Sequence, residues 1–325
     1  MKRKKIKRLA AAGAAMLMTL SLAGCGAGSR SVKLGAAGVG GGYYAFSNAF
    51  AQMAVAADED LEFEVKATAG STANIRLLSD GYIDMAIAQA DLVDAAYNGT
   101  GVTDKKRYRG YSAVASLYTE ACQIVVRADS GIDSLDDLQG KKVSVGEEES
   151  GTQRNAEQIL KMTGLVESLV DTVNLDYVDA ANELKSGQID AFFCTAGIQT
   201  SVIEELSKEC DVKLIGIDDK CRDRLKSVYG FYTDYTIPAG TYEGQDQDVE
   251  TLGVRAVLLA RDDMDEEIVE ELTGLLFEHS QDIQYSIPLT FQIDESEAVK
   301  NVTIPFHDGA KAYYQKKRIE LPAEQ

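Results

Sequence analysis

The sequence has little of the chemistry that marks an enzyme or a nucleotide-binding protein. It contains only two histidines, His279 and His307, and neither belongs to an H-x-x-x-H or G-x-S-x-G arrangement. The loop GAAGVGGGYY does not complete a G-x-G-x-x-G pattern, because Tyr43 stands where the last glycine is required, and no G-K-[ST] follows. We therefore expect no cofactor. An enzyme that works through scattered carboxylates remains an alternative.

Positive charge is also scarce. The chain has 33 Lys and Arg residues against 52 Asp and Glu residues, which gives a formal net charge of −19. Residues 1–24 hold six positive charges and no negative ones, so their removal leaves −25. Such an excess of negative charge disfavours nucleic acids and anionic membrane surfaces as partners.

Long apolar runs are absent except at the start. A basic stretch, KRKKIKR, precedes an apolar stretch from Leu9 to Leu22 that is short for a membrane span, which needs about 20 residues. We interpret residues 1–24 as a lipoprotein signal peptide, because LAGC, which ends at Cys25, is similar to a bacterial lipobox. Residues 25–30 then form a lipidated, flexible tether. The mature protein is expected to be extracytoplasmic and anchored to the cell membrane by lipid alone, with any transport pore in another chain.

The other cysteines are few and form no metal signature. Cys122 and Cys194 lie in apolar, strand-like runs and are interpreted as small hydrophobic residues. Cys210 and Cys221 flank DVKLIGIDDK and could form a disulfide in an exported protein, but their spacing does not decide whether their Cα atoms are close enough.

One pattern occurs twice. GYIDMAIAQAD starts at Gly81 and GQIDAFFCTAG starts at Gly187, and each follows an amphipathic run. We interpret each copy as the end of a helix, a turn with a positive-φ glycine, and a buried parallel strand that begins its packing at Ile83 or Ile189. The predicted strands are residues 85–88 and 191–194.

The similarity extends upstream of both copies. Near the start of the mature chain, the order is a strand, a glycine-rich loop, a helix and a second strand, and KKVSVGEEESGTQRNAEQILKM followed by TVNLDYV repeats that order. Two βαβαβ units of this length predict an α/β protein with two lobes.

The loops of both units supply hydrogen-bond donors. Ser150, Gly151 and Thr152 precede a helix, and Gly40–Gly42 with Tyr43 or Tyr44 do the same in the first unit. Helix N-termini suit a carboxylate or another anion, and in open α/β sheets ligands collect beyond the carboxyl ends of the strands. Two such edges that face each other form a cleft. A two-lobed exported protein with no catalytic arrangement is most simply a solute receptor that closes by a hinge motion.

The chain resembles the TAXI family, the extracytoplasmic solute-binding subunits of one class of TRAP transporter. The resemblance covers nearly all of the mature chain and includes GGGYYAFSNAFAQM, GSTANIRLLSDGYIDMAIAQAD and LKSGQIDAFFCTAG. TIPAGTYEGQDQDV together with IPFHDGAKAYY is its most specific part.

The resemblance implies a type II periplasmic-binding-protein fold with a hinge and an interlobe cleft. Residues 31–117 and 236–325 would form lobe I, and residues 118–235 lobe II. It also implies a monomer that delivers a small carboxylate, such as a glutamate-like amino acid or a dicarboxylate, to a separate TRAP membrane subunit driven by an ion gradient. The alternatives are the binding subunit of an ATP-driven importer, a lipid-anchored sensor, or an enzyme on the same fold.

By motif, the resemblance gives these ligand-binding positions: Tyr43, Tyr44, Ser71, Thr72, Gln89, Asp91, Ser150, Gly151, Thr152, Thr195 and Gly197. We expect Gln89 and Thr195, at the ends of the two repeated segments, to approach one ligand from opposite lobes. Cys194, Thr195 and Ala196 depart from the aromatic or glycine-rich stretch expected at this point.

Overall fold

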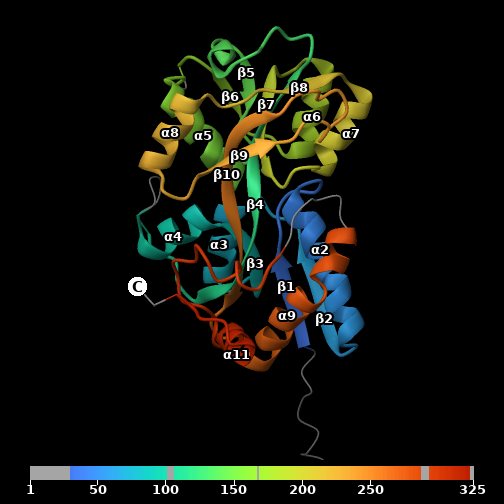
Figure 1. Ribbon diagram of the computed structural model, residues 1–325, viewed down its shortest axis with the longest axis vertical. Coiled ribbons are helices and arrows are strands. Elements are labelled where there is room, and N and C mark those ends of the chain that lie inside the picture. The colour runs from blue at the N-terminus through green and yellow to red at the C-terminus, as the bar shows by residue number, and fades with distance from the viewer. Residues whose placement is uncertain (1–29, 101–105, 167, 287–292, 323–325) are drawn as a thin grey trace, which may run out of the picture.

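Two long strands connect the two halves of the molecule. The computed structural model describes residues 30–100, 106–166, 168–286 and 293–322. Strand β4 (Tyr111–Arg127) and strand β10 (Val249–Arg261) run antiparallel through the middle of the sheet, with one group of strands and helices at each end (Figure 1). The strand order is β2-β1-β3-β10-β4-β7-β5-β6, while β8 pairs with β4 and β9 with β10.

Lobe I is the lower half in Figure 1. Its strands are β1 (Arg30–Gly35), β2 (Leu61–Lys66) and β3 (Met85–Gln89), which are parallel. Its helices are α2 (Gly42–Ala57), α3 (Ser71–Ser79), α4 (Ala90–Asn98), α9 (Glu266–Glu278), α10 (Ser280–Ser286) and α11 (Asp308–Lys317). All five residues of β3 are buried, as the apolar run predicts for a strand covered on both faces.

Lobe II is the upper half and repeats the parallel arrangement. Its parallel strands are β5 (Lys142–Ser144), β6 (Asp171–Val173) and β7 (Ala191–Ala196). The short strands β8 (Val212–Leu214) and β9 (Thr233–Ile237) pair antiparallel with β4 and β10. Its helices are the 3-10 helix η1 (Leu135–Leu138), α5 (Gly151–Thr163), α6 (Tyr177–Ser186), α7 (Ser201–Glu209) and α8 (Asp219–Val228). The fold is therefore the predicted two-lobed α/β fold.

The repeated sequence has the predicted local structure. Gly81 and Gly187 have φ angles of 76° and 74°, which a residue with a Cβ adopts only at a cost. Ile83 and Ile189, two residues further on, are 3% and 2% exposed. Each copy thus ends a helix and starts a buried strand.

The two crossing strands pair antiparallel with their neighbours, so the sheet is not purely parallel. β10 pairs antiparallel with β3 in lobe I, and β4 pairs antiparallel with β7 in lobe II. At Gly253 in β10, an added Cβ would lie 2.4 Å from Thr119 Cγ2 of β4, so only glycine fits where the two strands pass between the lobes.

Residues beyond 236, the predicted start of the second lobe I segment, still contact lobe II. Tyr242 packs in a core of lobe II, and its hydroxyl donates to Gln123 Oε1 at 2.6 Å. Val254 also packs with lobe II, whereas Ala256 packs with lobe I. We therefore propose that the chain returns to lobe I within β10, between these two residues.

Neither the export signal nor the lipid attachment site lies in the described part of the chain, because residues 1–29, with Cys25, are outside it. Cys122, Cys194, Cys210 and Cys221 are all free, so the Cys210–Cys221 pairing left open above does not occur in this structure. Among the described helices, none has the length and apolar character of a membrane span.

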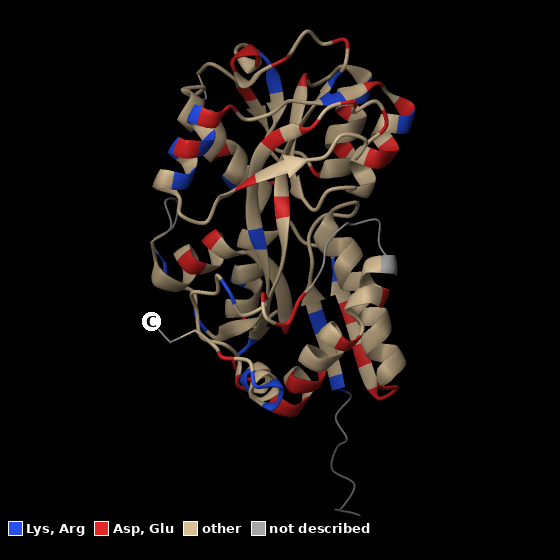
Figure 2. Ribbon diagram, viewed as in Figure 1, with Lys and Arg blue, Asp and Glu red and all other residues tan. Residues whose placement is uncertain are grey.

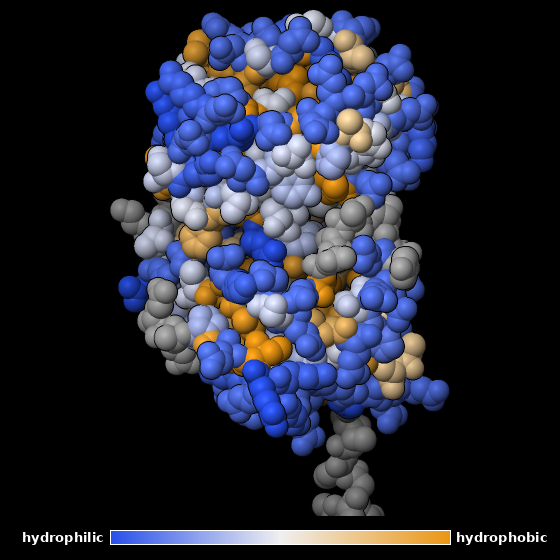
Figure 3. Space-filling view, in the orientation of Figure 1, coloured by the Kyte–Doolittle hydropathy of each residue, from blue (hydrophilic) through white to orange (hydrophobic). Residues whose placement is uncertain are grey.

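The surface is acidic and mostly hydrophilic, as expected from the negative net charge of the sequence. Acidic residues are spread over both lobes (Figure 2). Most of the face seen in Figure 3 is hydrophilic, with smaller apolar areas on each lobe.

Truncating either repeated isoleucine should destabilise its own lobe. Because both side chains are buried, we expect Ile83→Ala and Ile189→Ala each to lower the free energy of unfolding by about 2–5 kcal/mol. The exposed neighbours Tyr82 and Gln188 are matched controls, and their alanine variants should stay within about 0.5 kcal/mol of the parent. Denaturant titration of the four variants measures this. Equal losses in the isoleucine and control variants would contradict the assignment of the repeat to the two cores.

Candidate functional site

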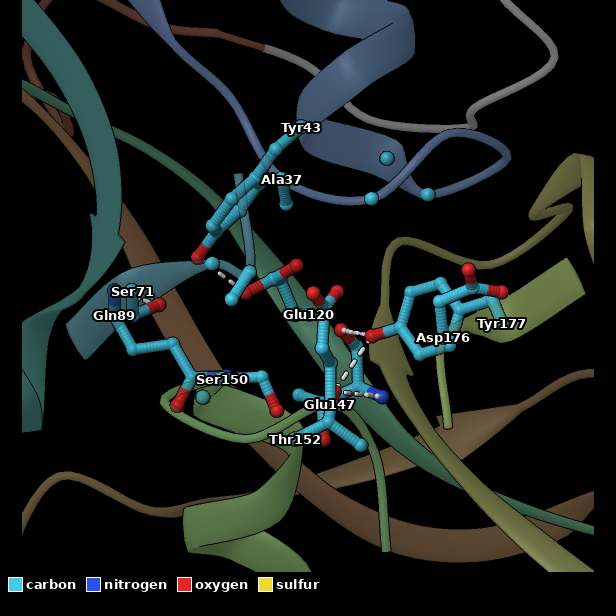
Figure 4. Close-up of a pocket in the computed structure, with 17 residues that line it drawn as sticks. Ala37, Tyr43, Ser71, Gln89, Glu120, Glu147, Ser150, Thr152, Asp176 and Tyr177 are labelled. Atoms are coloured by element: carbon cyan, nitrogen blue, oxygen red, sulfur yellow. Dashed lines mark hydrogen bonds between the residues drawn. The ribbon is translucent and has the colours of Figure 1, made fainter. Parts of the chain in front are cut away.

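A small cavity lies between the two lobes, beside the crossing strands. Its volume is about 40 Å³, which is room for a few water-sized groups. The residues that line it come from both lobes: Ala37, Gly38, Gly41, Gly42, Tyr43, Ala69, Gly70, Ser71, Gln89, Glu120, Glu147, Ser150, Gly151, Thr152, Asp176, Tyr177 and Thr195 (Figure 4). The lining is rich in glycine and polar side chains.

Direct bonds hold the lobes together beside this cavity. Helix α3 of lobe I starts after Gly70 and has no side-chain cap. Instead, the carbonyl oxygen of Glu149, in the loop before α5 of lobe II, accepts the N–H groups of Thr72 at 3.1 Å and Ala73 at 3.2 Å. Arg76 Nη2 also donates to Glu149 Oε2 at 2.6 Å. The structure is therefore a closed form of the protein.

Gln89 makes a second bridge between the lobes. It ends β3, where its N–H donates to Ser71 Oγ at 3.1 Å, and its Nε2 donates to Asn155 Oδ1 of α5 at 3.0 Å. An added Cβ on Gly151 would lie 2.5 Å from Gln89 Cδ, so the two lobes meet here without space for a side chain. Gln89 Oε1 is buried and has no hydrogen-bond partner among the described residues. The cavity thus contains an acceptor that is not satisfied.

The hydroxyl groups at the start of α5 are already used within lobe II. Ser150 is the N-cap, because its Oγ accepts the N–H of Gln153 at 2.9 Å. Thr152 Oγ1 lies 2.6 Å from Tyr177 Oη and accepts the N–H of Thr195 at 3.2 Å. The donors that remain for a ligand are the N–H groups of Gly151 and Thr152, which have no acceptor within their own helix.

One titratable group of the cavity, Glu120, lies on the crossing strand β4. The Tyr43 hydroxyl donates to Glu120 Oε2 at 2.6 Å, and Glu120 is 2% exposed. Burial raises the pKa of this carboxyl to about 8, although hydrogen bonds from Tyr43 and Gln89 act in the opposite direction. Glu120 is therefore mostly protonated at pH 7 in this form.

Two further acids, Glu147 and Asp176, line the cavity from lobe II. Asp176 caps helix α6 by accepting the N–H of Asp179 at 2.8 Å. Burial, followed by the charge of Asp176, raises the pKa of Glu147. In Figure 4, Glu120 and Glu147 lie near the centre of the view, between Tyr43 and Thr152. No lysine, arginine or histidine from the described part of the chain lines the cavity.

The structure brings together seven of the eleven sequence-predicted positions, which are Tyr43, Ser71, Gln89, Ser150, Gly151, Thr152 and Thr195. Gln89 and Thr195 come from opposite lobes, as expected from the repeat.

The other four positions lie nearby but do not line the cavity. Tyr44 is half-buried on α2, and the N–H of Thr72 points to Glu149. Asp91 is in the first turn of α4, where burial raises its pKa to about 6. The carbonyl of Gly197 accepts the hydroxyl of Thr200.

Sequence reasoning missed the acids of the cavity and Tyr177. Glu120 interrupts an otherwise apolar strand, and that single charge within ASLYTEACQIVV was the available signal. Glu147 and Asp176 stand among many surface acids in a strongly acidic chain, so nothing in their local sequence set them apart.

Neither histidine takes part in the cavity. His307 caps α11 by accepting the N–H of Gly309 at 3.1 Å, and His279 pairs with Asp282. Within residues 30–322, wherever the structure describes them, no group of three or more His, Cys, Asp or Glu side chains is placed to hold a metal ion.

Two α/β lobes, two crossing strands and a polar cavity between the lobes define the periplasmic-binding-protein fold. The chain belongs to the NMT1-like family, whose model matches residues 34–317. It is similar to a solved protein of Bordetella bronchiseptica RB50, with a TM-score of 0.56 and 15% identity over 89% of this chain and 98% of that one.

Two further solved structures show the same fold. A protein described as a periplasmic transporter has a TM-score of 0.54 and 13% identity, and the match covers 81% of this chain and 88% of that one. A Listeria monocytogenes protein assigned to an L-cystine ABC transporter has a TM-score of 0.50 and 13% identity over 79% and 94% of the two chains.

The ion pair between Arg76 and Glu149 should bias the empty protein toward the closed form. Both side chains are more than one-third exposed, so screening limits the effect of Arg76→Gln to about 1 kcal/mol, or roughly a fivefold change in the closed-to-open ratio. Lys185→Gln, which removes an ion pair within lobe II, is the matched control. Small-angle scattering should show an expanded average for Arg76→Gln alone. Identical profiles for the two variants would show that this ion pair does not influence closure.

Glu120 should make the stability of the empty protein depend on pH. Its pKa is raised from 4.5 to about 8, so the folded protein retains a proton that the unfolded chain releases. The resulting stabilisation is complete below about pH 4.5 and is lost as the pH rises through about 8. Denaturant titrations at pH 5, 7 and 9 should show Glu120→Gln gaining stability relative to the parent as the pH rises. A constant difference between the two proteins would contradict the buried, protonated carboxyl.

Proposed function

We propose that this protein is an extracytoplasmic solute-binding protein that captures a small solute between its lobes and delivers it to a membrane transporter. The observation that supports this most directly is that the cavity exists only where the lobes meet. Gln89 of lobe I and the first turn of α5 of lobe II touch each other at its wall. A site assembled by closure is suited to capture and release a ligand through a hinge motion.

A carboxylate is the proposed partner of the α5 N-terminus. Gly151 and Thr152 line the cavity in the first turn of α5, where N–H groups have no acceptor within the helix and the positive end of the helix dipole favours an anionic group. The ligand that we propose is therefore a small carboxylate, as expected from the sequence, and its carboxylate end lies on lobe II.

The membrane partner is proposed to be a transporter in a separate chain. The Listeria monocytogenes neighbour is assigned to an ABC transporter, which favours an ATP-driven importer over the TRAP transporter implied by the sequence resemblance. Attachment through a lipid on Cys25 would place the protein at the outer face of the cell membrane. Crosslinking in intact cells, followed by identification of the captured membrane protein, distinguishes the two transporter classes.

An enzyme on the same fold is the less favoured alternative. The hydroxyls of Ser150 and Thr152 are engaged in structural hydrogen bonds, and no histidine of the described chain lines the cavity to activate them. A ligand recovered unchanged after prolonged incubation with the protein supports binding, whereas turnover would support the enzyme.

Gly151→Ala should separate ligand capture from folding. Gly151 is the first residue of α5 and has no positive φ, so alanine suits its backbone, but the new Cβ would collide with Gln89 when the lobes close. We expect ligand affinity to fall by about tenfold or more, because a displaced buried amide costs roughly 1–3 kcal/mol, while the melting temperature of the empty protein changes little.

Gly230→Ala is the matched control. Nothing lies within 4 Å of the Cβ that alanine would add in lobe II, so this variant should bind as the parent does. Calorimetry and thermal melting measure both properties. If Gly151→Ala retains full affinity, the ligand does not bind between the closed lobes.

A further inference from the structure

The charges of the cavity are inconsistent with a ligand that carries two carboxylates. Glu120, Glu147 and Asp176 all line the cavity, and its described lining has no cationic side chain. The lobe-bridging cation Arg76 is already paired with Glu149, and Arg154 of α5, whose charge acts on Asp91, is not part of the lining. The α5 N-terminus provides for one anionic group, but a second one would lie beside Glu147 and Asp176, and no cationic side chain of the described lining could pair with it.

Two buried acceptors point instead to a donor on the ligand. Glu120 lines the cavity from strand β4, and an ionised carboxylate has more acceptor sites than the hydrogen bonds from Tyr43 and Gln89 occupy. Gln89 Oε1, which is also buried, has no partner in the described structure. An ammonium group has three donors and no acceptor, so it can satisfy a carboxylate and an amide oxygen at the same time.

We propose that the ligand of this cavity carries a protonated amine, held by Glu120 and Gln89 Oε1, and has no more than one carboxylate. This inference rests on the proposed solute-binding function and defines the class of solute. Glu120 is the residue that selects the amine, and the α5 N-terminus holds the carboxylate where the ligand has one. Dicarboxylates, including those with an additional amine, should bind more weakly, because the described lining offers no cationic side chain for a second carboxylate.

Binding of such a ligand is coupled to release of a proton. The acids near Glu120 are Asp91 from α4 and the two other acids of the cavity, Glu147 and Asp176. The other titratable groups near it are Tyr43 from α2, Tyr118 and Cys122 from β4, Cys194 from β7 and Tyr177 from α6. Burial raises the pKa of each of these tyrosines and cysteines, so they stay neutral at pH 7. An incoming ammonium group therefore favours ionisation of Glu120, which is mostly protonated in the empty protein.

The selectivity is tested with length-matched probes. The probes have chains of two, three or four carbons. At each length, four probes are compared, which carry two amines, an amine and a carboxylate, two carboxylates, or two hydroxyls. Calorimetry with the parent protein should give binding of the amine-bearing probes at least about tenfold tighter than that of the diacid or diol of the same length. A diacid or diol that binds as tightly as the amines overturns this inference and leaves the solute-binding proposal intact.

A wider thermal-shift panel of sugars, amino acids, sulfonates and dicarboxylates is measured alongside the probes. A ligand without an amine, found there while the amines fail, also overturns the inference alone. If neither the probes nor the compounds of the panel bind, both the solute-binding function and the inference about the amine are rejected.

Glu120→Gln tests the residue. Glutamine keeps the size and an acceptor for Tyr43 but cannot carry a negative charge, so amine affinity should fall by about 30-fold or more at pH 8. Glu148→Gln is the control, since Glu148 is an exposed acid in the loop beside Glu147 and does not line the cavity. It should change affinity less than twofold.

The dependence on pH distinguishes direct recognition from a structural effect. In the parent, amine affinity should rise by up to about tenfold per pH unit between pH 6 and pH 8 and then level off, because ionisation of Glu120 becomes easier. Glu120→Gln should lose this slope. An unchanged slope in the variant, or unchanged amine affinity, would overturn the role of Glu120.

Discussion

Helix α3 has its first donors satisfied by the other lobe. It starts after a glycine without a side-chain cap, and the Glu149 carbonyl accepts its N–H groups from Thr72 and Ala73. A capping interaction contributes about 0.5–2 kcal/mol to helix stability, so part of the stability of lobe I depends on contact with lobe II. Glu149 adopts a φ of 64° to present this carbonyl, a conformation that costs a residue with a Cβ about 1 kcal/mol or more. The closed form is therefore held by the contact between the strained loop at Glu149 and the uncapped N-terminus of α3.

The cavity beside this contact is unfavourable when it is closed and empty. It confines a carboxyl on Glu120 in a protonated state and leaves the amide oxygen of Gln89 without a donor. Both defects disappear if a ligand with a suitable donor is enclosed. The closing contacts and the polar defects thus oppose each other in the empty protein, and a bound amine would relieve the defects. This balance gives the ligand a differential affinity for the closed form, which a hinged receptor requires.

Local sequence patterns predicted the repeated units well. The positive-φ glycines, the buried isoleucines and the two buried strands follow from rules that act over a few residues, and all are present. Asp91 and Gly197 show where such rules stop. Both follow the ends of predicted strands but do not line the cavity, because the position of a residue after a strand depends on how the next helix packs.

Of the three acids of the cavity, only Glu120 has a signal in its local sequence, where it is the single charge in an apolar stretch. Glu120 becomes a site residue only because β4 passes between the lobes at that point, and this position depends on long-range antiparallel pairing with β10 and β7. The proposed return of the chain within β10 is non-local for the same reason, since Tyr242 packs against residues of lobe II that are distant in sequence. The charge of the proposed ligand follows from these tertiary contacts alone.

The central claim is that the lobes close around a ligand, and a distance measurement between them tests it most directly. Spin labels placed at the exposed positions Glu59 of lobe I and Glu205 of lobe II, in a protein with Cys25 and Cys210 replaced by serine, report the interlobe distance by pulsed electron resonance. The account predicts a mixture of longer and shorter distances in the empty protein and a single short distance with the tightest-binding amine at saturation. The same distribution with and without that amine would contradict it.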